Sequence, residues 1–211
     1  MRKFGAFELQ SLSAGPLSTN TYVLSSGNES ILVDSGTDHK EIIEKLSLDK
    51  KVIRALIMTH GHFDHIFDAM EFKRKLGCDL MIGEHDTEIM EWSYKVSERY
   101  MGRIIEQIEV DRFLRDGDTI PLGQSSVKII SLPGHTMGSI GLMAGPLILT
   151  GDVLFRGTIG RTDVGGSMES MNHSLKRLSE LDQEILVFPG HGPETTIKNE
   201  LEKNPFMKDL G

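Results

Sequence analysis

The most chemically distinctive segment of the chain runs from Thr59 to His65 and reads THGHFDH. Imidazole and carboxylate groups are ligands that borderline divalent metals such as zinc accept in proteins. His60 and His62 are two residues apart at the end of an apolar run, so in an extended chain their rings point to the same side and can share one ion. Asp64 and His65 follow where the chain turns, and they can face a second ion beside the first.

Three further ligand-type residues each follow an apolar run elsewhere in the chain. They are His135 in LPGH, Asp152 in LTGD and His191 in FPGH. A single histidine of this kind is more often an ordinary loop or core residue, because a buried imidazole needs only a hydrogen-bond partner. Three residues in the same local context, together with the first cluster, favour a metal site. Seven protein ligands are too many for one tetrahedral ion, so the set predicts two ions that a carboxylate can bridge.

A centre with two metal ions predicts hydrolytic chemistry. Two divalent ions about 3.5–4 Å apart hold a hydroxide between them, because coordination lowers the pKa of water to about 7. The hydroxide attacks a carbonyl carbon while a metal takes up the charge on the oxygen. Asp64 and Asp152 are the expected catalytic carboxylates. Metals that only stabilise the fold are a weaker interpretation, because structural zinc sites are normally closed and mononuclear.

Short apolar runs alternate with helical stretches along the chain, which predicts an α/β protein. We expect strands at 4–12, 21–26, 30–35, 55–59, 79–83, 119–123, 126–134, 139–144, 146–152 and 185–190, and helices at 40–46, 66–76, 84–107, 168–180 and 194–203. Each ligand motif falls where a strand ends, which is where α/β proteins place binding groups. The two halves share this pattern, so we expect a two-sheet sandwich with helices outside, formed as one domain over residues 1–211.

The helical segment 84–107 contains the single tryptophan and two of the three tyrosines. Aromatic residues at helical spacing usually face a core, so a core-facing helix pair is the simpler interpretation. The alternative is an insertion in which Trp92, Tyr94 or Tyr100 lines a substrate pocket. The single cysteine, Cys78, is expected to be a small buried residue and not a nucleophile.

Charge and composition limit the partners of the protein. The net charge is −8 with histidine neutral, and no stripe of Lys and Arg could follow a phosphate backbone, so nucleic acid is not expected. The N-terminal segment has no continuous apolar region, and neither a membrane span nor a secretion signal is predicted. A single cysteine agrees with a reducing compartment. We therefore expect a cytoplasmic protein that acts on a small molecule, with its oligomeric state open.

The motifs together resemble the metallo-β-lactamase superfamily, and within it the compact, single-domain form of the glyoxalase II-like thioester hydrolases. They run from Asp34 in LVDSG to His191 and cover most of the chain. The resemblance implies a four-layer αββα sandwich and two divalent ions, with zinc expected first and iron or manganese as alternatives. It implies that one ion is bound by His60, His62 and His135, that the other is bound by Asp64, His65 and His191, and that Asp152 bridges them.

The resemblance also gives roles to residues around the metals. Asp34 matches a buried aspartate that orients a ligand without being one itself. Arg161, in GRTD, lies where a cationic residue contacts the thiol carrier of glyoxalase II-like enzymes, and a guanidinium suits a carboxylate. The alternative for Arg161 is a surface ion pair with Asp163, and Arg156 is a weaker candidate for the same contact. A thiol pKa of about 8.5 makes a thiolate a competent leaving group, so a small thioester substrate requires no dedicated general acid.

Two features depart from the pattern of full-length glyoxalase II. The chain continues only from residue 191 to residue 211 after the last motif, so we expect no helical glutathione-binding domain. His191 is followed by Gly192 and Pro193, where the glutathione-handling enzymes have an aromatic residue. The thiol carrier therefore stays open.

The same resemblance leaves other activities as alternatives. A persulfide dioxygenase would hold one iron through His60, His135 and Asp152 and would consume oxygen. A lactone or ester hydrolase would use the same metal centre as a thioesterase. A β-lactamase is disfavoured because those enzymes do not usually have an acidic bridge at the position that matches Asp152. A nuclease is disfavoured by the acidic net charge.

Overall fold

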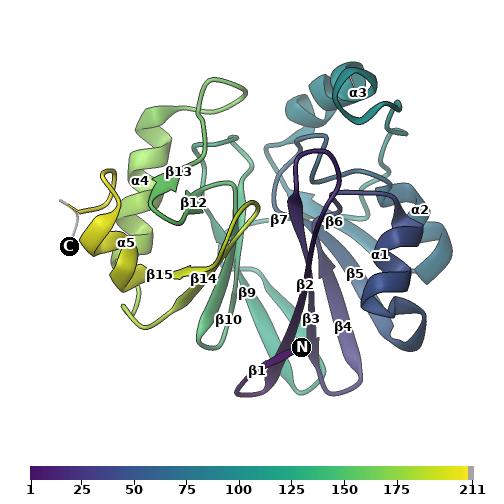
Figure 1. The fold of residues 1–211 in the computed structure, drawn as a ribbon, viewed down its shortest axis with the longest axis horizontal. Helices are drawn as coiled ribbons and strands as arrows, with labels where there is room; N and C mark the ends of the chain where they lie inside the picture. The colour runs from purple at the N-terminus through teal and green to yellow at the C-terminus, as the bar shows by residue number, and fades with distance from the viewer. Residues whose placement is uncertain (209–211) are drawn as a thin grey trace.

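The computed structural model describes residues 1–208, apart from the side chain of Asp49, and it contains two facing β-sheets with helices on their outer sides (Figure 1). Within the described chain the first sheet has seven strands in sequential order. They are β1 (Arg2–Phe4), β2 (Phe7–Ala14), β3 (Thr19–Ser26), β4 (Glu29–Val33), β5 (Val52–Met58), β6 (Asp79–Gly83) and β7 (Arg112–Leu114). Pairing is antiparallel from β1 to β4 and parallel from β4 to β7.

The second sheet has the strand order β15-β14-β11-β10-β9-β8 within the described residues. Its strands are β8 (Thr119–Leu122), β9 (Ser125–Ser131), β10 (Ile140–Ala144), β11 (Leu147–Gly151), β14 (Leu186–Pro189) and β15 (Thr195–Thr196). Strands β11 and β14 are parallel, and the other pairs are antiparallel. A short separate hairpin is formed by β12 (Leu154–Phe155) and β13 (Thr158–Ile159).

Helices cover the outer face of each sheet (Figure 1). The first sheet is covered by α1 (His39–Leu46), η1 (Leu48–Lys50), α2 (Ala69–Leu76) and α3 (Thr87–Met101), and the second by α4 (Met168–Ser179) and α5 (Ile197–Lys203). The predicted αββα sandwich is therefore confirmed. Within residues 1–208, no helix has both the length and the apolar character that a membrane span requires.

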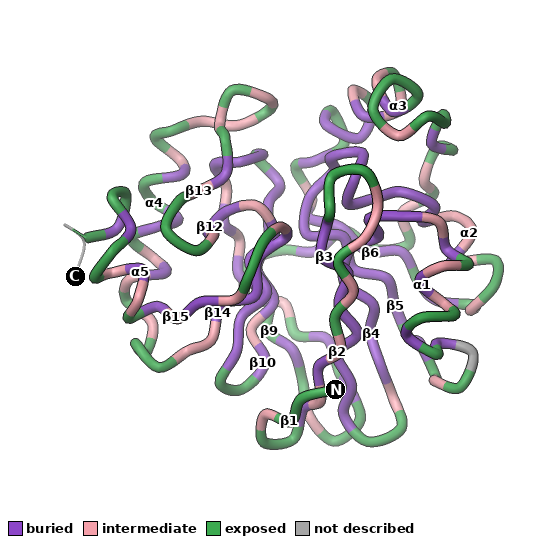
Figure 2. Tube along the Cα trace, viewed as in Figure 1, coloured by how far each residue is buried: buried purple, intermediate pink, exposed green. Residues whose placement is uncertain are grey.

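The strands of both sheets are largely buried (Figure 2), and alternation along them divides the buried residues into layers. In β5, Ala55 and Ile57 pack between the sheets, whereas Leu56 and Met58 pack under the helices of the first sheet. This arrangement follows from the period of two in a strand, which sends successive side chains to opposite faces. Cys78 is buried in the same outer layer, as predicted.

The two sheets are joined at the edge where the predicted ligands lie. The backbone N–H of Asn20 donates to the Gly190 carbonyl at 2.7 Å, and that of Ile140 donates to the Thr59 carbonyl at 2.9 Å. Strands β9, β11 and β14 run in the same direction, so their carboxyl ends reach one edge of the second sheet. These bonds hold that edge against the end of β5 in the first sheet.

Several predicted element boundaries were wrong, and backbone conformation explains the differences. The helix expected at 66–76 begins at Ala69, because Asp68 has a left-handed backbone with φ 58°. The helix expected at 84–107 ends at Met101, where Gly102 adopts φ 71° and stops the helical hydrogen bonding.

Two predicted elements at the ends of the chain also need correction. The strand expected at 4–12 is two strands, because Gly5 forms a turn at φ 60° between β1 and β2. The last helix begins at Ile197 and not at 194, because Thr195 and Thr196 pair with β14 as β15. The short edge strand β7 was not predicted.

Replacing Phe72 with alanine tests the packing of α2 on the first sheet. The Phe72 ring is fully buried, so Phe72→Ala is expected to lower the free energy of unfolding by about 3–5 kcal/mol, which is the usual cost of deleting a buried aromatic ring. Urea unfolding followed by circular dichroism measures the change. Phe206→Ala is the matched control, because Phe206 is 44% exposed, and it should change the free energy by no more than about 0.5 kcal/mol. Equal losses in the two variants would contradict this packing.

Candidate metal centre

The fold brings the seven predicted ligands together at the shared edge of the two sheets. They come from the segments that follow β5, β9, β11 and β14. Their metal-binding atoms form overlapping groups in which all atoms lie within 4.8 Å of one another: His60, His62 and His135; His60, His65 and Asp152; and Asp64, His65 and His191. The overlap makes one continuous centre.

The first group consists of three histidine rings whose nitrogens converge. His135 Nε2 lies 2.8 Å from His62 Nδ1 and 3.2 Å from His60 Nε2. All three side chains are buried. The Nδ1–H group of His135 donates to the Arg161 carbonyl, so its Nε2 presents a lone pair to the other two rings. Three buried imidazoles whose nitrogens face one point form a donor set that a divalent metal accepts, and the group therefore fits a metal ion.

The second group combines two imidazoles with a carboxylate. His191 Nε2 lies 3.2 Å from Asp64 Oδ2 and 3.3 Å from His65 Nε2. His65 is fully buried, and its Nε2 lies 3.6 Å from the same Asp64 oxygen. Two nitrogens and one oxygen facing a common point form a donor set that zinc, iron and manganese accept.

Asp152 lies between the two groups. Its Oδ1 is 3.4 Å from His65 Nε2, and its Oδ2 is 3.5 Å from His191 Nε2 and 3.7 Å from His135 Nε2. One carboxylate therefore reaches ligands of both groups, which is the arrangement that a bridging role requires. Gly190 makes room for it, because a Cβ atom at that position would overlap Asp152 Oδ1 and crowd the His65 ring.

Atoms left without hydrogen bonds also support a metal at this position. Asp152 Oδ1 is among the few buried side-chain atoms in the described chain that have no hydrogen-bond partner. An unpaired buried carboxylate oxygen is expensive, and buried charges are normally paired or coordinate a metal. The donor set, the converging lone pairs and this oxygen all fit two divalent ions.

The ring nitrogens that face away from the centre are held by outer partners. His65 Nδ1 donates to Asp34 Oδ2 at 2.8 Å, and the same carboxylate accepts the backbone N–H and the hydroxyl of Thr59. Asp34 has a left-handed backbone with φ 58°, a conformation that aspartate tolerates better than most residues. These contacts place Asp34 behind the site, where it orients His65 without facing the centre.

Two other ligand histidines donate to backbone carbonyls. His135 Nδ1 lies 2.7 Å from the Arg161 carbonyl, and His191 Nδ1 lies 3.1 Å from the Leu17 carbonyl. A carbonyl only accepts, so each Nδ1 carries the proton and each Nε2 is free to bind metal. Thr19 supports the second group in a similar way, because its hydroxyl donates to Asp64 Oδ2 at 2.8 Å.

Burial and mutual repulsion lower the pKa values of the first group. Desolvation is the largest cause for His62, and together with the neighbouring imidazoles it lowers the pKa of His62 to about 4. The pKa of His60 lies well below its ordinary value for the same reasons. Burial also lowers the pKa of His135. These rings are therefore neutral at physiological pH, which is the form that coordinates metals.

The second group has the opposite electrostatic character. Burial opposes a charge on His65, but Asp152, Asp34 and Asp64 together raise its pKa well above the ordinary value. The pKa of His191 is also raised, because Asp64 and Asp152 outweigh its desolvation. Carboxylates thus concentrate negative charge in a buried site, and a bound cation would balance that charge.

Arg161 and Asp163 form an exposed ion pair at the edge of the centre. Arg161 Nε and Nη2 each lie 2.7 Å from a carboxylate oxygen of Asp163. The pairing lowers the pKa of Asp163 to about 2, with the hydrogen bond from Arg161 as the largest cause. The Arg161 guanidinium thus forms the surface ion pair with Asp163 that the sequence analysis gave as the alternative. Its backbone carbonyl also holds His135, a role that the sequence did not indicate. Arg156 is exposed and is not among the described residues that line the cavity at the metal centre.

A cavity of about 180 Å³ opens onto the centre. Its lining combines predicted ligands with apolar side chains: Leu17, His62, Phe63, Asp64, Trp92, His135, Asp152, Arg161, Val164 and His191. Of the aromatic residues considered for the pocket, Trp92 lines this cavity. Tyr100 stacks on Phe63 with ring centroids 5.0 Å apart.

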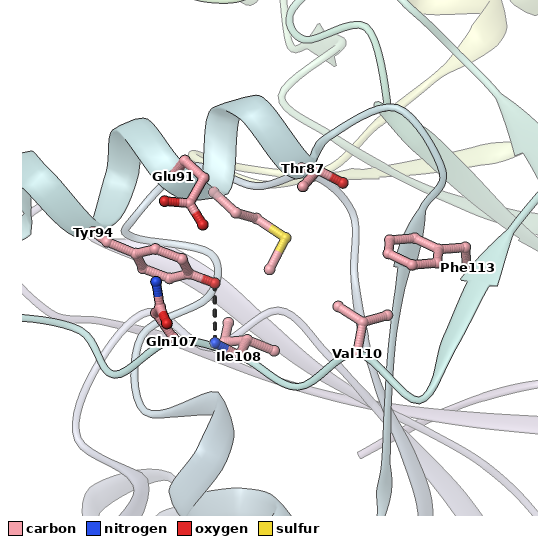
Figure 3. A pocket seen from close by; sticks show the side chains of 8 residues that line it. Thr87, Glu91, Tyr94, Gln107, Ile108, Val110 and Phe113 are labelled. Atoms are coloured by element: carbon pink, nitrogen blue, oxygen red, sulfur yellow. Dashed lines mark hydrogen bonds between the residues drawn. The ribbon is translucent and has the colours of Figure 1, made fainter.

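Tyr94 faces the opposite side of α3, where it lines a separate hollow of about 300 Å³ (Figure 3). Its hydroxyl accepts the backbone N–H of Ile108 at 3.0 Å. The hollow is larger than the cavity at the centre, but its lining contains no predicted ligand among the described residues. It therefore does not hold the reacting group.

Asp86 is a site residue that the sequence interpretation missed. Its buried carboxylate accepts the backbone N–H groups of Gly61 and Gly138, each at 2.7 Å, and the Thr136 hydroxyl at 2.8 Å. These bonds tie the loop of His60 and His62 to the loop of His135. The only sequence signal was an aspartate just before a helix, which predicts an N-cap, yet Asp86 makes no capping bond to α3.

The chain belongs to the metallo-beta-lactamase superfamily, whose family pattern matches residues 14–191. Its curated relatives include the hydroxyacylglutathione hydrolase GloC of Haemophilus influenzae, which is 34% identical and aligns over 83% of this chain and 86% of that protein.

Solved structures agree in fold. A B3 metallo-beta-lactamase, BLEG-1, superposes with a TM-score of 0.84 at 30% identity, over 95% of this chain and 99% of that one. TTHA1623, solved in a di-iron-bound form, also gives a TM-score of 0.84, at 31% identity, over 93% of this chain and 99% of that one. The family, the fold and the clustered His and Asp residues together identify a metal-binding protein of this superfamily.

Replacing Asp86 with asparagine tests its role in positioning the ligands. In Asp86→Asn an amide N–H₂ group replaces one acceptor oxygen opposite backbone donors, so the two ligand loops should separate and metal affinity should fall about 10–100-fold. Competition with a chromophoric chelator measures the affinity. Glu84→Gln is the control, because Glu84 lies on the same segment but pairs with Arg115 at the surface. Unchanged affinity in a folded Asp86→Asn protein would show that the carboxylate does not position the ligands.

Proposed function

We propose that this protein is a metal-dependent thioesterase of the glyoxalase II type, which cleaves S-acyl thiol conjugates, S-hydroxyacyl conjugates among them. His60, His62 and His135 would hold one divalent ion, Asp64, His65 and His191 the other, and Asp152 would bridge them. When bound, such ions supply a nucleophile by lowering the pKa of water and stabilise negative charge on a carbonyl oxygen. Similarity to a hydroxyacylglutathione hydrolase over most of both chains supports the proposal.

The observation that carries the proposal is the chemistry of the cavity lining. Within the described chain, every titratable side chain that lines the cavity is either a proposed metal ligand or Arg161, which is paired with Asp163. No side chain there is left to act as a separate general acid. An alkoxide or amine leaving group needs a proton donor, whereas a thiolate does not, because its thiol has a pKa of about 8.5. A thioester is the acyl substrate that this lining suits best.

The protein's own side chains would position the substrate and shield it. Phe63 and Trp92 place apolar surface beside the ligand histidines, with the His62 and Trp92 ring centroids 5.7 Å apart. This surface excludes water from one side of the reacting carbonyl. Asp64 is fixed by the Thr19 hydroxyl, so the carboxylate keeps its orientation during the reaction.

The second ligand group supports hydrolysis over the dioxygenase alternative. A persulfide dioxygenase would use one iron at His60, His135 and Asp152, and it would leave Asp64, His65 and His191 without a function as a convergent set. The present donors suit zinc, which we propose as the metal, and they also accept iron, the metal of a structural relative.

Metal analysis combined with thioester hydrolysis tests this function. The purified protein is expected to contain close to two divalent ions per chain and to release thiol from a panel of thioesters that includes S-lactoylglutathione, at the same rate with and without oxygen. Mass spectrometry of the metals and a colorimetric thiol assay provide the readouts. One iron per chain with oxygen consumption and no hydrolysis would support the dioxygenase instead. Ring opening of nitrocefin or of a lactone without thioester hydrolysis would also contradict the proposal.

Asp152→Ala tests the bridging carboxylate. Because Asp152 would be a ligand to both ions, its loss should lower kcat/KM by more than the factor of about 100 that the loss of an outer partner costs. The metal content should fall in the same variant. Asp182→Ala, at an exposed carboxylate on the surface, is the control and should keep both properties. Full activity in Asp152→Ala would exclude the binuclear centre.

A further inference from the structure

We propose that the substrate carries an apolar, preferably aromatic, acyl group without a charge, and that Phe63 and Trp92 form the surface that selects it. This inference rests on the proposed thioesterase function. It concerns the part of the substrate beside the carbonyl, and it assigns to α3 a specificity role that the metal ligands alone do not supply.

The position and size of the cavity show which part of a thioester it holds. The reacting carbonyl must reach the ligand side chains His62, Asp64 and Asp152, which form part of the cavity lining. The cavity has a volume of about 180 Å³, below the range of about 300–1,000 Å³ that is usual for pockets enclosing a whole drug-sized ligand. It therefore accommodates the smaller acyl group, and the thiol carrier extends toward solvent.

Apolar side chains line this cavity from both sides. Phe63 lies within the ligand loop itself, and Trp92 packs beside it with ring centroids 6.1 Å apart. Leu17, from the turn between β2 and β3, and Val164 also contribute to the lining. The two rings pack on each other and together present an aromatic surface to the cavity, and such a surface favours an apolar acyl group, above all an aromatic one that can make offset or edge contacts with it.

The aromatic surface is fixed relative to the metal ligands. The Ser93 hydroxyl on α3 donates to the Gly61 carbonyl at 2.8 Å, directly between His60 and His62. On the opposite side of α3, the Tyr94 hydroxyl accepts the N–H of Ile108, which attaches the helix to the following loop (Figure 3). These bonds attach α3, and with it Trp92, to the ligand loop and to the loop that follows the helix. A fixed surface discriminates between acyl groups better than a mobile one.

The charges at the cavity oppose a carboxylate on the acyl group. Arg161 is the one Lys or Arg among the described residues that line the cavity, and its Nε and Nη2 groups donate to the Asp163 carboxylate. A carboxylate placed against Phe63 and Trp92 would lose water without gaining an unpaired cationic side chain. Within the described lining, Arg161 is thus the one Lys or Arg that the carboxylates of a peptide thiol carrier could meet, and its ion pair with Asp163 weakens that attraction, so the identity of the carrier should matter less than that of the acyl group.

Kinetics with four matched thioesters test the inference. Acetyl and phenylacetyl groups are each attached to N-acetylcysteamine, which is uncharged, and to glutathione. For the metal-loaded wild type, kcat/KM should be at least about tenfold higher for phenylacetyl than for acetyl, since even one methylene in a fitted apolar pocket is worth about tenfold or more. Exchange of the carrier should change kcat/KM by less than the exchange of the acyl group.

Variants of α3 separate specificity from folding. Trp92→Ala should keep its metal content but lose most of the preference for phenylacetyl, because kcat/KM should fall by a much larger factor for the phenylacetyl thioesters than for the acetyl thioesters. Trp92→Phe should retain the preference, because a ring remains. Glu91→Ala is the matched control, since Glu91 is the neighbouring position on the same helix and lines the opposite hollow, and it should behave as the wild type.

The outcomes distinguish the two proposals. If the metal-loaded wild type hydrolyses neither the four thioesters nor S-lactoylglutathione, the thioesterase function itself fails. If it hydrolyses S-lactoylglutathione but none of the four, the thioesterase proposal stands and the acyl specificity is wrong. If it hydrolyses the four thioesters but prefers acetyl, depends mainly on glutathione, or loses the same factor for both acyl groups in Trp92→Ala, the thioesterase proposal stands and the acyl specificity is wrong.

Discussion

The close approach of buried, like groups is the constraint on which this structure depends. His135 Nε2 lies 2.8 Å from a His62 nitrogen and 3.2 Å from a His60 nitrogen in a buried group, and carboxylates crowd the adjoining group. In the first group, burial and the neighbouring imidazoles disfavour a proton on the rings, and in the second group the carboxylates favour positive charge beside them. Divalent ions turn the same contacts into coordination, so the fold is built around charges that the chain itself does not provide.

The scaffold holds this arrangement by fixing each ligand from behind. Strand ends bring the ligands to one edge, and outer partners then set the direction of each ring. Asp34 holds His65 and Thr59, carbonyls hold His135 and His191, and Asp86 ties two ligand loops together. Such partners fix both the tautomer and the position of a ligand, which is why they contribute to metal affinity without touching the metal.

Helix α3 connects the candidate metal centre to the cavity that opens onto it. The Ser93 hydroxyl on this helix donates to the Gly61 carbonyl in the ligand loop. Trp92, on the same helix, lines the cavity beside that loop. In the proposed function, one helix would thus both support the ligands and contact the acyl group, and it would fix the position of the reacting carbonyl relative to the metals. Positioning of this kind can account for a large part of enzymatic rate enhancement.

The sequence by itself determined the layers of the fold and the identity of the ligand candidates, because alternation along strands and the spacing within THGHFDH are local properties that survive without tertiary information. It also predicted the ion pair of Arg161 with Asp163 as an alternative, because these residues are only two positions apart in the chain. The tertiary structure alone decided which face of α3 meets the centre, since aromatic residues occur on both faces. It also decided the role of Asp86, whose partners lie 25 to 52 residues away along the chain. Contacts between residues so far apart in the chain depend on how the two sheets pack, so a local sequence pattern does not predict them.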